Sequence, residues 1–63
     1  MATELLRPVG SPSQLLAIWI AEEQTALEHA HRLVACGEIR LSEEWLKAAA
    51  RSRVQAELWA QAA

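Results

Sequence analysis

One short motif in the chain has the spacing of a metal site, Glu28-His29-Ala30-His31, with a carboxylate three residues before an imidazole. Residues three apart share a helix face, and di-metal helical bundles use such Glu-x-x-His pairs together with carboxylates from other helices. Here the pair falls on the polar side of the expected helix, and the facing stretch 48–51 holds no carboxylate. We therefore expect no metal and no other cofactor. A metal-binding bundle built on Glu28 and His31 is the alternative function.

Cys36 is the single cysteine, so no disulfide can form within the chain. It falls near the C-terminal end of a predicted helix, where the helix dipole disfavours a thiolate. A Cys–His nucleophile with His31 or His29 would also need an oxyanion site, and a pair of helices provides no cleft for one. We therefore predict no catalytic residues and no enzymatic activity.

Local signals place a first helix over about residues 12–36. The segment Ser11-Pro12-Ser13-Gln14 combines an N-cap serine, a proline suited to the first helical position and a glutamine that completes a capping box. Apolar residues then recur with helical spacing as far as Cys36. Gly37 suits a left-handed C-terminal cap.

A short connection over residues 37–41 leads to a second helix, for which Ser42 is the predicted N-cap and about residues 43–62 the predicted extent. Short connections join antiparallel neighbours. The predicted fold class is therefore all-α, an antiparallel helical hairpin. Residues 11–63 form the hairpin domain, and residues 1–10 form an N-terminal arm.

Composition and charge argue against several classes of protein. The formal net charge is -2 and basic residues form no stripe, so we expect no nucleic-acid partner. The longest apolar run, Leu15 to Ala21, is far shorter than the ~20 residues of a membrane helix, and the adjoining Glu22 and Glu23 disfavour binding of this run to a membrane surface, so we expect no membrane association. The N-terminal residues lack the pattern of a signal peptide, which favours a cytoplasmic location.

The helical faces predict self-association. The first helix carries a coiled-coil-like seam at positions 16, 20, 23, 27, 30 and 34. The second carries a seam of small residues between tryptophans, at Trp45, Ala49, Ser52, Ala56, Trp59 and Ala63, and a separate apolar ridge at Leu46, Ala50, Val54 and Leu58. One hairpin partner covers only one of these two surfaces. A chain of about 60 residues also buries only about 60% of its unfolded surface, so we expect a homodimer, a four-helix bundle of two hairpins.

Glu23 is the ionisable residue in the first seam. A carboxylate among apolar side chains is costly unless it is paired, and such a polar position can set register and oligomeric state. We therefore expect Glu23 to determine the specificity of assembly. A titrating or ligand-binding carboxylate is the competing interpretation.

The surface left over on the second helix contains Arg51, Val54, Leu58 and Trp59. Tryptophan is enriched at binding hot spots, and a basic rim around apolar side chains favours an acidic partner. The predicted function is a small non-enzymatic protein–protein interaction module, a regulator or inhibitor that docks on a second protein through its helices. The competing interpretation is that this ridge is itself the dimer seam.

Overall fold

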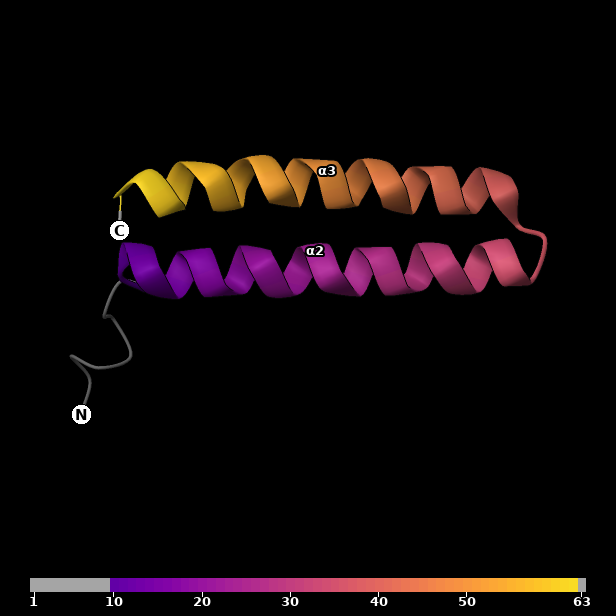
Figure 1. Cartoon of the computed structure of the whole chain (residues 1–63), viewed down its shortest axis with the longest axis horizontal. Helices are drawn as coiled ribbons and strands as arrows, with labels where there is room; N and C mark the ends of the chain where they lie inside the picture. Colours follow the sequence, from indigo (N-terminus) through magenta and orange to yellow (C-terminus); the bar gives the residue numbers. More distant parts are fainter. Residues whose placement is uncertain (1–9, 63) are drawn as a thin grey trace, which may run out of the picture.

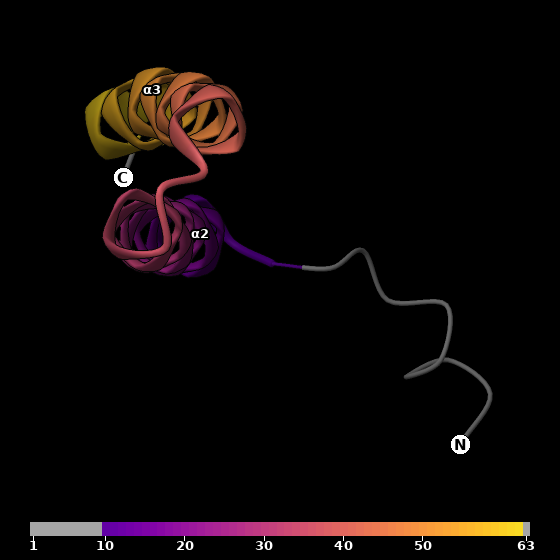
Figure 2. The same ribbon diagram turned by 90° about the vertical axis from the view of Figure 1, so that its right-hand side faces the viewer.

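The computed structural model describes residues 10–62, which form two helices, α2 (Pro12–Ala35) and α3 (Ile39–Ala62). The helices lie side by side and run in opposite directions (Figure 1). Seen along its length, the described part of the chain is a single layer of two helices (Figure 2). The predicted all-α antiparallel hairpin is confirmed. The predicted N-terminal arm falls almost wholly on residues 1–9, outside the described residues.

The start of α2 has the capping box that the sequence predicts. The backbone N–H of Gln14 donates to the Ser11 hydroxyl at 3.3 Å, and the Ser11 N–H donates to Gln14 Oε1 at 2.9 Å. Two N–H groups without helical partners are thereby satisfied. Pro12 occupies the first turn, where its missing N–H removes no helical hydrogen bond.

The end of α2 is a Schellman motif around Gly37, which has a φ of +81°. The Glu38 N–H donates to the Leu33 carbonyl at 2.8 Å, and the Gly37 N–H donates to the Val34 carbonyl at 3.0 Å. A residue with a side chain resists this left-handed conformation, so the predicted role of Gly37 is confirmed.

The second helix starts at Ile39, so its predicted start near residue 43 is wrong. The Schellman motif reverses the chain within Gly37 and Glu38, and the next residues already continue as helix. Ser42 is therefore a residue of the first turn and not the N-cap. It is buried, its N–H donates to the Glu38 carbonyl at 3.0 Å, and its hydroxyl donates to the Ile39 carbonyl at 2.6 Å.

The seam predicted on α3 faces α2 as expected over its described positions, and its last position, Ala63, lies outside the described residues. Ala49, Ser52 and Ala56 are buried, and Trp59 is half-buried. Trp45, at the turn end of the seam, keeps 39% of its surface exposed.

The seam predicted on α2 is rotated in the structure. Ile20, Leu27 and Val34 are 42%, 38% and 51% exposed, whereas Ala26 and Ala30 are buried. The α2 positions at least half-buried are 15, 16, 19, 23, 26, 29, 30 and 33. The physical reason is close approach: a backbone packed on the small residues of α3 leaves room for alanine but not for a large branched side chain.

We predict that Gly37→Ala lowers the free energy of unfolding by about 1 kcal/mol, because alanine resists a positive φ. A Cβ at this position meets no atom within 4 Å, so crowding contributes nothing. Gly37→Asn is the matched control, since asparagine tolerates the left-handed conformation, and it should lose less. Urea titration followed by circular dichroism measures both, and equal losses would contradict the backbone explanation.

We also predict that Ala49→Leu lowers the free energy of unfolding by about 1–3 kcal/mol, because it forces the two helices apart. Ala49 is only 4% exposed. Ala21→Leu makes the same change on the exposed side of α2 and should stay within about 0.5 kcal/mol of the parent. The measurement is urea unfolding at one fixed protein concentration.

Candidate interaction surfaces

Large apolar side chains lie on the outside of the hairpin. Within residues 10–62, the buried residues are four alanines and two serines, and no large side chain is fully buried. The exposed large hydrophobic residues, between 38% and 55% accessible, are Ile18, Ile20, Leu27, Val34, Ile39, Leu41, Trp45, Leu46, Val54 and Leu58. An isolated exposed leucine is ordinary, but a hairpin whose large apolar residues are mostly outside has surfaces suited to a partner.

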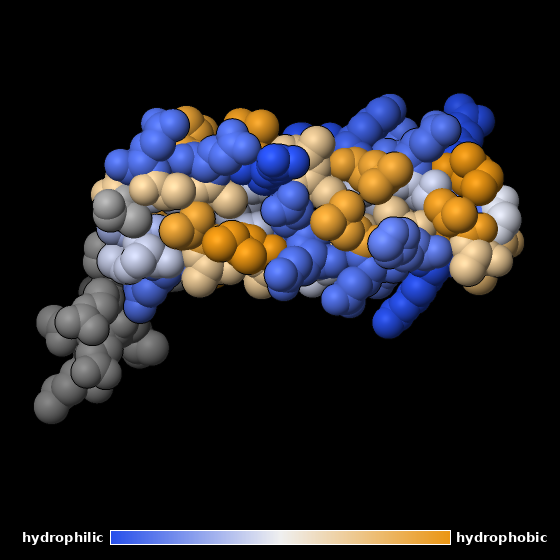
Figure 3. Space-filling model, viewed as in Figure 1, coloured by the Kyte–Doolittle hydropathy of each residue, from blue (hydrophilic) through white to orange (hydrophobic). Residues whose placement is uncertain are grey.

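Five of these residues share one side of the hairpin, which we call the lateral face: Ile20, Leu27, Val34, Ile39 and Leu46. They recur seven residues apart on each helix, beside the seam, and in an antiparallel pair of helices these positions project to the same side. Figure 3 shows hydrophobic groups on both helices on one side of the molecule, with a hydrophilic band across the middle. The lateral face is therefore apolar toward the turn and toward the start of α2, and polar between them.

Glu23 and Arg53 lie near the middle of the lateral face. The two helices begin and end together (Figure 1), and the ring centroids of His29 and Trp45 are 4.6 Å apart. A residue of α2 therefore lies at the same height along the helix axis as the residue of α3 whose number, added to its own, gives about 74. Glu23 and Arg53 are therefore within one helical turn of each other along the axis. Two ion pairs form in the described residues, and half-buried Glu23 belongs to neither.

Among residues 10–62, Arg53 has one ion-pair partner, and the contact is loose. Its Nε lies 3.4 Å from Oε1 of Glu57, one turn along α3, and the two side chains are 70% and 64% exposed. An exposed pair of this kind contributes little to stability and exchanges readily. The guanidinium is thus available to another carboxylate.

A second surface, which we call the outer ridge, consists of Arg51, Val54 and Leu58 on the side of α3 away from α2. Their spacing of three and four residues stacks them on successive turns, and Val54 and Leu58 are 55% and 54% exposed. Trp59, predicted to join them, follows Leu58 by about 100° around the helix and is half-buried in the seam.

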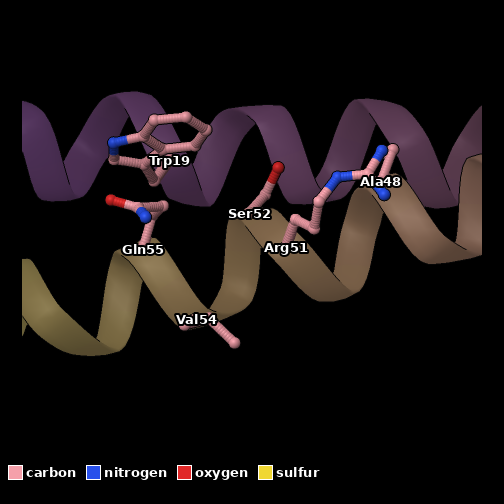
Figure 4. Close-up of a pocket in the computed structure, with 6 residues that line it drawn as sticks. All are labelled: Trp19, Ala48, Arg51, Ser52, Val54 and Gln55. Atoms are coloured by element: carbon pink, nitrogen blue, oxygen red, sulfur yellow. The ribbon is translucent and has the colours of Figure 1, made fainter.

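A shallow open hollow of about 460 Å³ lies between α2 and the outer ridge (Figure 4). Trp19 of α2 lies over Gln55, the hydroxyl of Ser52 points toward α2, and the Arg51 side chain runs along α3 toward Ala48. Figure 4 also shows Val54 at the rim, pointing away from α2. Such a hollow suits one apolar side chain of a partner, with an amide and a guanidinium beside it.

Sequence reasoning missed the role of Trp19 in this hollow. It placed Trp19 on the apolar arc of its helix without assigning it a neighbour. The signal that could have identified this role is the register between the two helices, which places Trp19 opposite Gln55. The contact between His29 and Trp45 was missed for the same reason, because it joins residues that the register of the two helices brings together.

The residues considered for metal binding or nucleophilic chemistry are exposed. Glu28, His31 and Cys36 all lie on the surface, and His29 packs against Trp45 instead of a carboxylate or thiol. Within residues 10–62, no three side chains of the His, Cys, Asp and Glu types come together as a metal site would require. The geometry therefore does not favour the metal-binding alternative.

Neither α2 nor α3 is long and apolar enough to cross a membrane. Comparison with protein-family models, with curated proteins and with solved structures finds no match to the chain. The lateral face, the outer ridge and the hollow beside it are therefore the features of the chain that bear on its function.

We predict that protein purified without chelators and without added metal holds no stoichiometric iron, manganese or zinc. Glu28 and His31 have no further ligand near them in the described structure. Elemental analysis of the purified protein measures this. One metal ion per chain, lost in a Glu28→Gln variant and kept in Glu22→Gln, would contradict the prediction.

Proposed function

We propose that the hairpin is a non-enzymatic protein–protein interaction module, a regulator or inhibitor that docks on another protein through its helices. The observation that carries the proposal is the inverted distribution of side chains: the fully buried residues between the helices are alanine and serine, while most of the large apolar residues face outward. Burying apolar surface is the main favourable term in association, so these faces are where binding free energy is available.

The two uncovered surfaces receive different occupants in this proposal. The lateral face takes a second copy of the chain, which gives a four-helix bundle of two hairpins. A hairpin with a seam of small residues has little core of its own, and the second copy supplies one. The expected assembly is a homodimer with its outer ridges still exposed.

The outer ridge takes the foreign partner. Arg51 and Lys47 lie on the same side of α3 as Val54 and Leu58, which gives an apolar strip with a basic rim. Lys47 is 3.3 Å from Glu44 in an exposed pair, whereas Arg51 belongs to neither ion pair of the described residues. We propose a partner with an apolar patch edged by carboxylates, one of whose side chains enters the hollow beside Trp19.

The test is the double variant Arg51→Glu with Leu58→Asp, which reverses the rim and breaks the apolar strip. Sedimentation at micromolar concentration should still give the mass of two chains. Capture from the native host should lose whichever protein the parent retains. Ala17→Asp with Arg32→Glu makes the same change of charge on the opposite side of the hairpin, and it should keep that protein.

The possible outcomes distinguish the surface that forms the dimer from the surface that binds the foreign partner. A variant that becomes monomeric or unfolded shows that the outer ridge is the dimer seam, and it contradicts the placement of the foreign partner. Retention of the captured protein by the double variant does the same. A parent protein that sediments as a folded monomer contradicts the proposed dimer.

A further inference from the structure

We propose that the two hairpins pair with their turns at the same end, so that α2 of each lies on α3 of the other and Glu23 faces Arg53 of the second copy. This inference rests on the proposed homodimer. It adds how the two hairpins are arranged and which pair of residues determines that arrangement. It is carried by the positions of charged and large apolar residues on the lateral face.

Two hairpins that meet through one flat face have two twofold-symmetric arrangements. If the twofold axis runs along the helices, the turns lie together and each residue stays at its own level. If the axis crosses the helices at their middle, the turns lie at opposite ends, and α2 meets α2 while α3 meets α3. The two arrangements cover the same surface and differ only in which residues meet.

Charge favours the arrangement with the turns together. Glu23 lies at the middle of α2, which spans Pro12–Ala35, so the crossed arrangement brings the two Glu23 carboxylates face to face. Like charges at an interface are costly, and half-buried ones more so. With the turns together, each Glu23 instead meets the loosely held Arg53 of the other copy, within one helical turn along the axis.

The apolar residues favour the same arrangement. With the turns together, Leu27 comes level with Leu46 of the second copy, and Val34 comes level with its Ile39. In the crossed arrangement Leu46 lies level with position 55 of the other α3, close to the guanidinium of Arg53. Two pairs of large apolar side chains thus come level with the turns together, whereas the crossed arrangement brings only Ile20 level with Leu27 of the second copy.

The lateral face is large enough for a stable dimer. Two parallel helices of 24 residues form a face about 36 Å long and about 20 Å wide, or about 700 Å² per copy. Specific protein–protein interfaces bury about 1,200–2,000 Å² in total, or about 600–1,000 Å² per partner. The second copy therefore meets the size requirement without the outer ridge.

The single cysteine allows a direct test. Cys36 is exposed at the turn, so a spin label there reports the distance between the two turns in the dimer of the full chain. Double electron–electron resonance should give a distribution centred below about 30 Å if the turns lie together, as the spacing of bundle helices allows. The crossed arrangement should give about 40 Å, because the labels then lie a helix length apart.

Glu23→Leu tests the role of the carboxylate. Without the repulsion between carboxylates the crossed arrangement becomes accessible, so the variant should stay dimeric and gain a long-distance component. Glu22→Leu removes a carboxylate one residue away, on the opposite flank of the seam, and should keep the short distance alone. A long distance in the parent, or an unchanged short distance in Glu23→Leu, overturns the inference.

Charge exchange tests the pair itself. Glu23→Arg alone should weaken the dimer at least tenfold, because position 23 then meets a like charge in both arrangements, and adding Arg53→Glu should restore both affinity and short distance. If circular dichroism shows that the double variant is helical and the dimer is still not restored, the proposed Glu23–Arg53 contact is wrong. A dimeric parent whose labels show the long distance leaves the homodimer standing and rejects only its arrangement, whereas a monomeric parent rejects both.

Discussion

The contact between small side chains on α2 and α3 is the constraint on which the rest of the structure depends. Ala26 and Ala30 on one helix and Ala49 and Ala56 on the other are the buried apolar residues of the described chain. Small residues let two helix backbones approach closely, and they thereby fix the rotation of each helix about its own axis. The same residues remove little apolar surface from water, since the hydrophobic contribution grows with the area buried. The contact between small side chains therefore holds the two helices together but gives the hairpin only a small hydrophobic core.

The rotation of α2 about its axis and the turn at Gly37 together determine which apolar residues are exposed on the same side of the hairpin. Because α2 turns its alanines inward, Ile20, Leu27 and Val34 move to its flank. Because the Schellman motif at Gly37 lets α3 begin directly, the two helices have equal length and end level with each other. Leu46 and Ile39 then lie on the same side as the flank of α2. A longer connection would have shifted that register.

The separation of the two surfaces has a functional consequence. The lateral face lies beside the seam, and the outer ridge lies on the far side of α3, so one surface can be covered while the other stays open. A symmetric dimer through the lateral face would carry two outer ridges. Two linked sites bind a repeated or dimeric partner more tightly than one site, provided that their spacing matches. This would let a chain of modest contact area act as an effective regulator.

The sequence by itself determined the local elements of this protein. Ser11 with Gln14 specifies the start of α2, Gly37 specifies its end, and the spacing of Ala49, Ser52 and Ala56 identifies the inner face of α3. The first two signals act within a few residues, through hydrogen bonds and backbone dihedral angles, and the third is a pattern of small residues at helical spacing along one stretch of chain.

Only the tertiary structure decided which side of α2 faces inward, that α3 begins before Ser42, and which residues of the two helices lie level. Ala26 and Leu27 are consecutive apolar residues about 100° apart around the helix, and nothing local ranks one above the other for the seam. The choice depends on the size of the residues across the contact, which lie far away in the sequence. The hollow beside Trp19 and the nearness of Glu23 to Arg53 follow from that contact and from the register of the turn, so they could be seen only once both helices were in place.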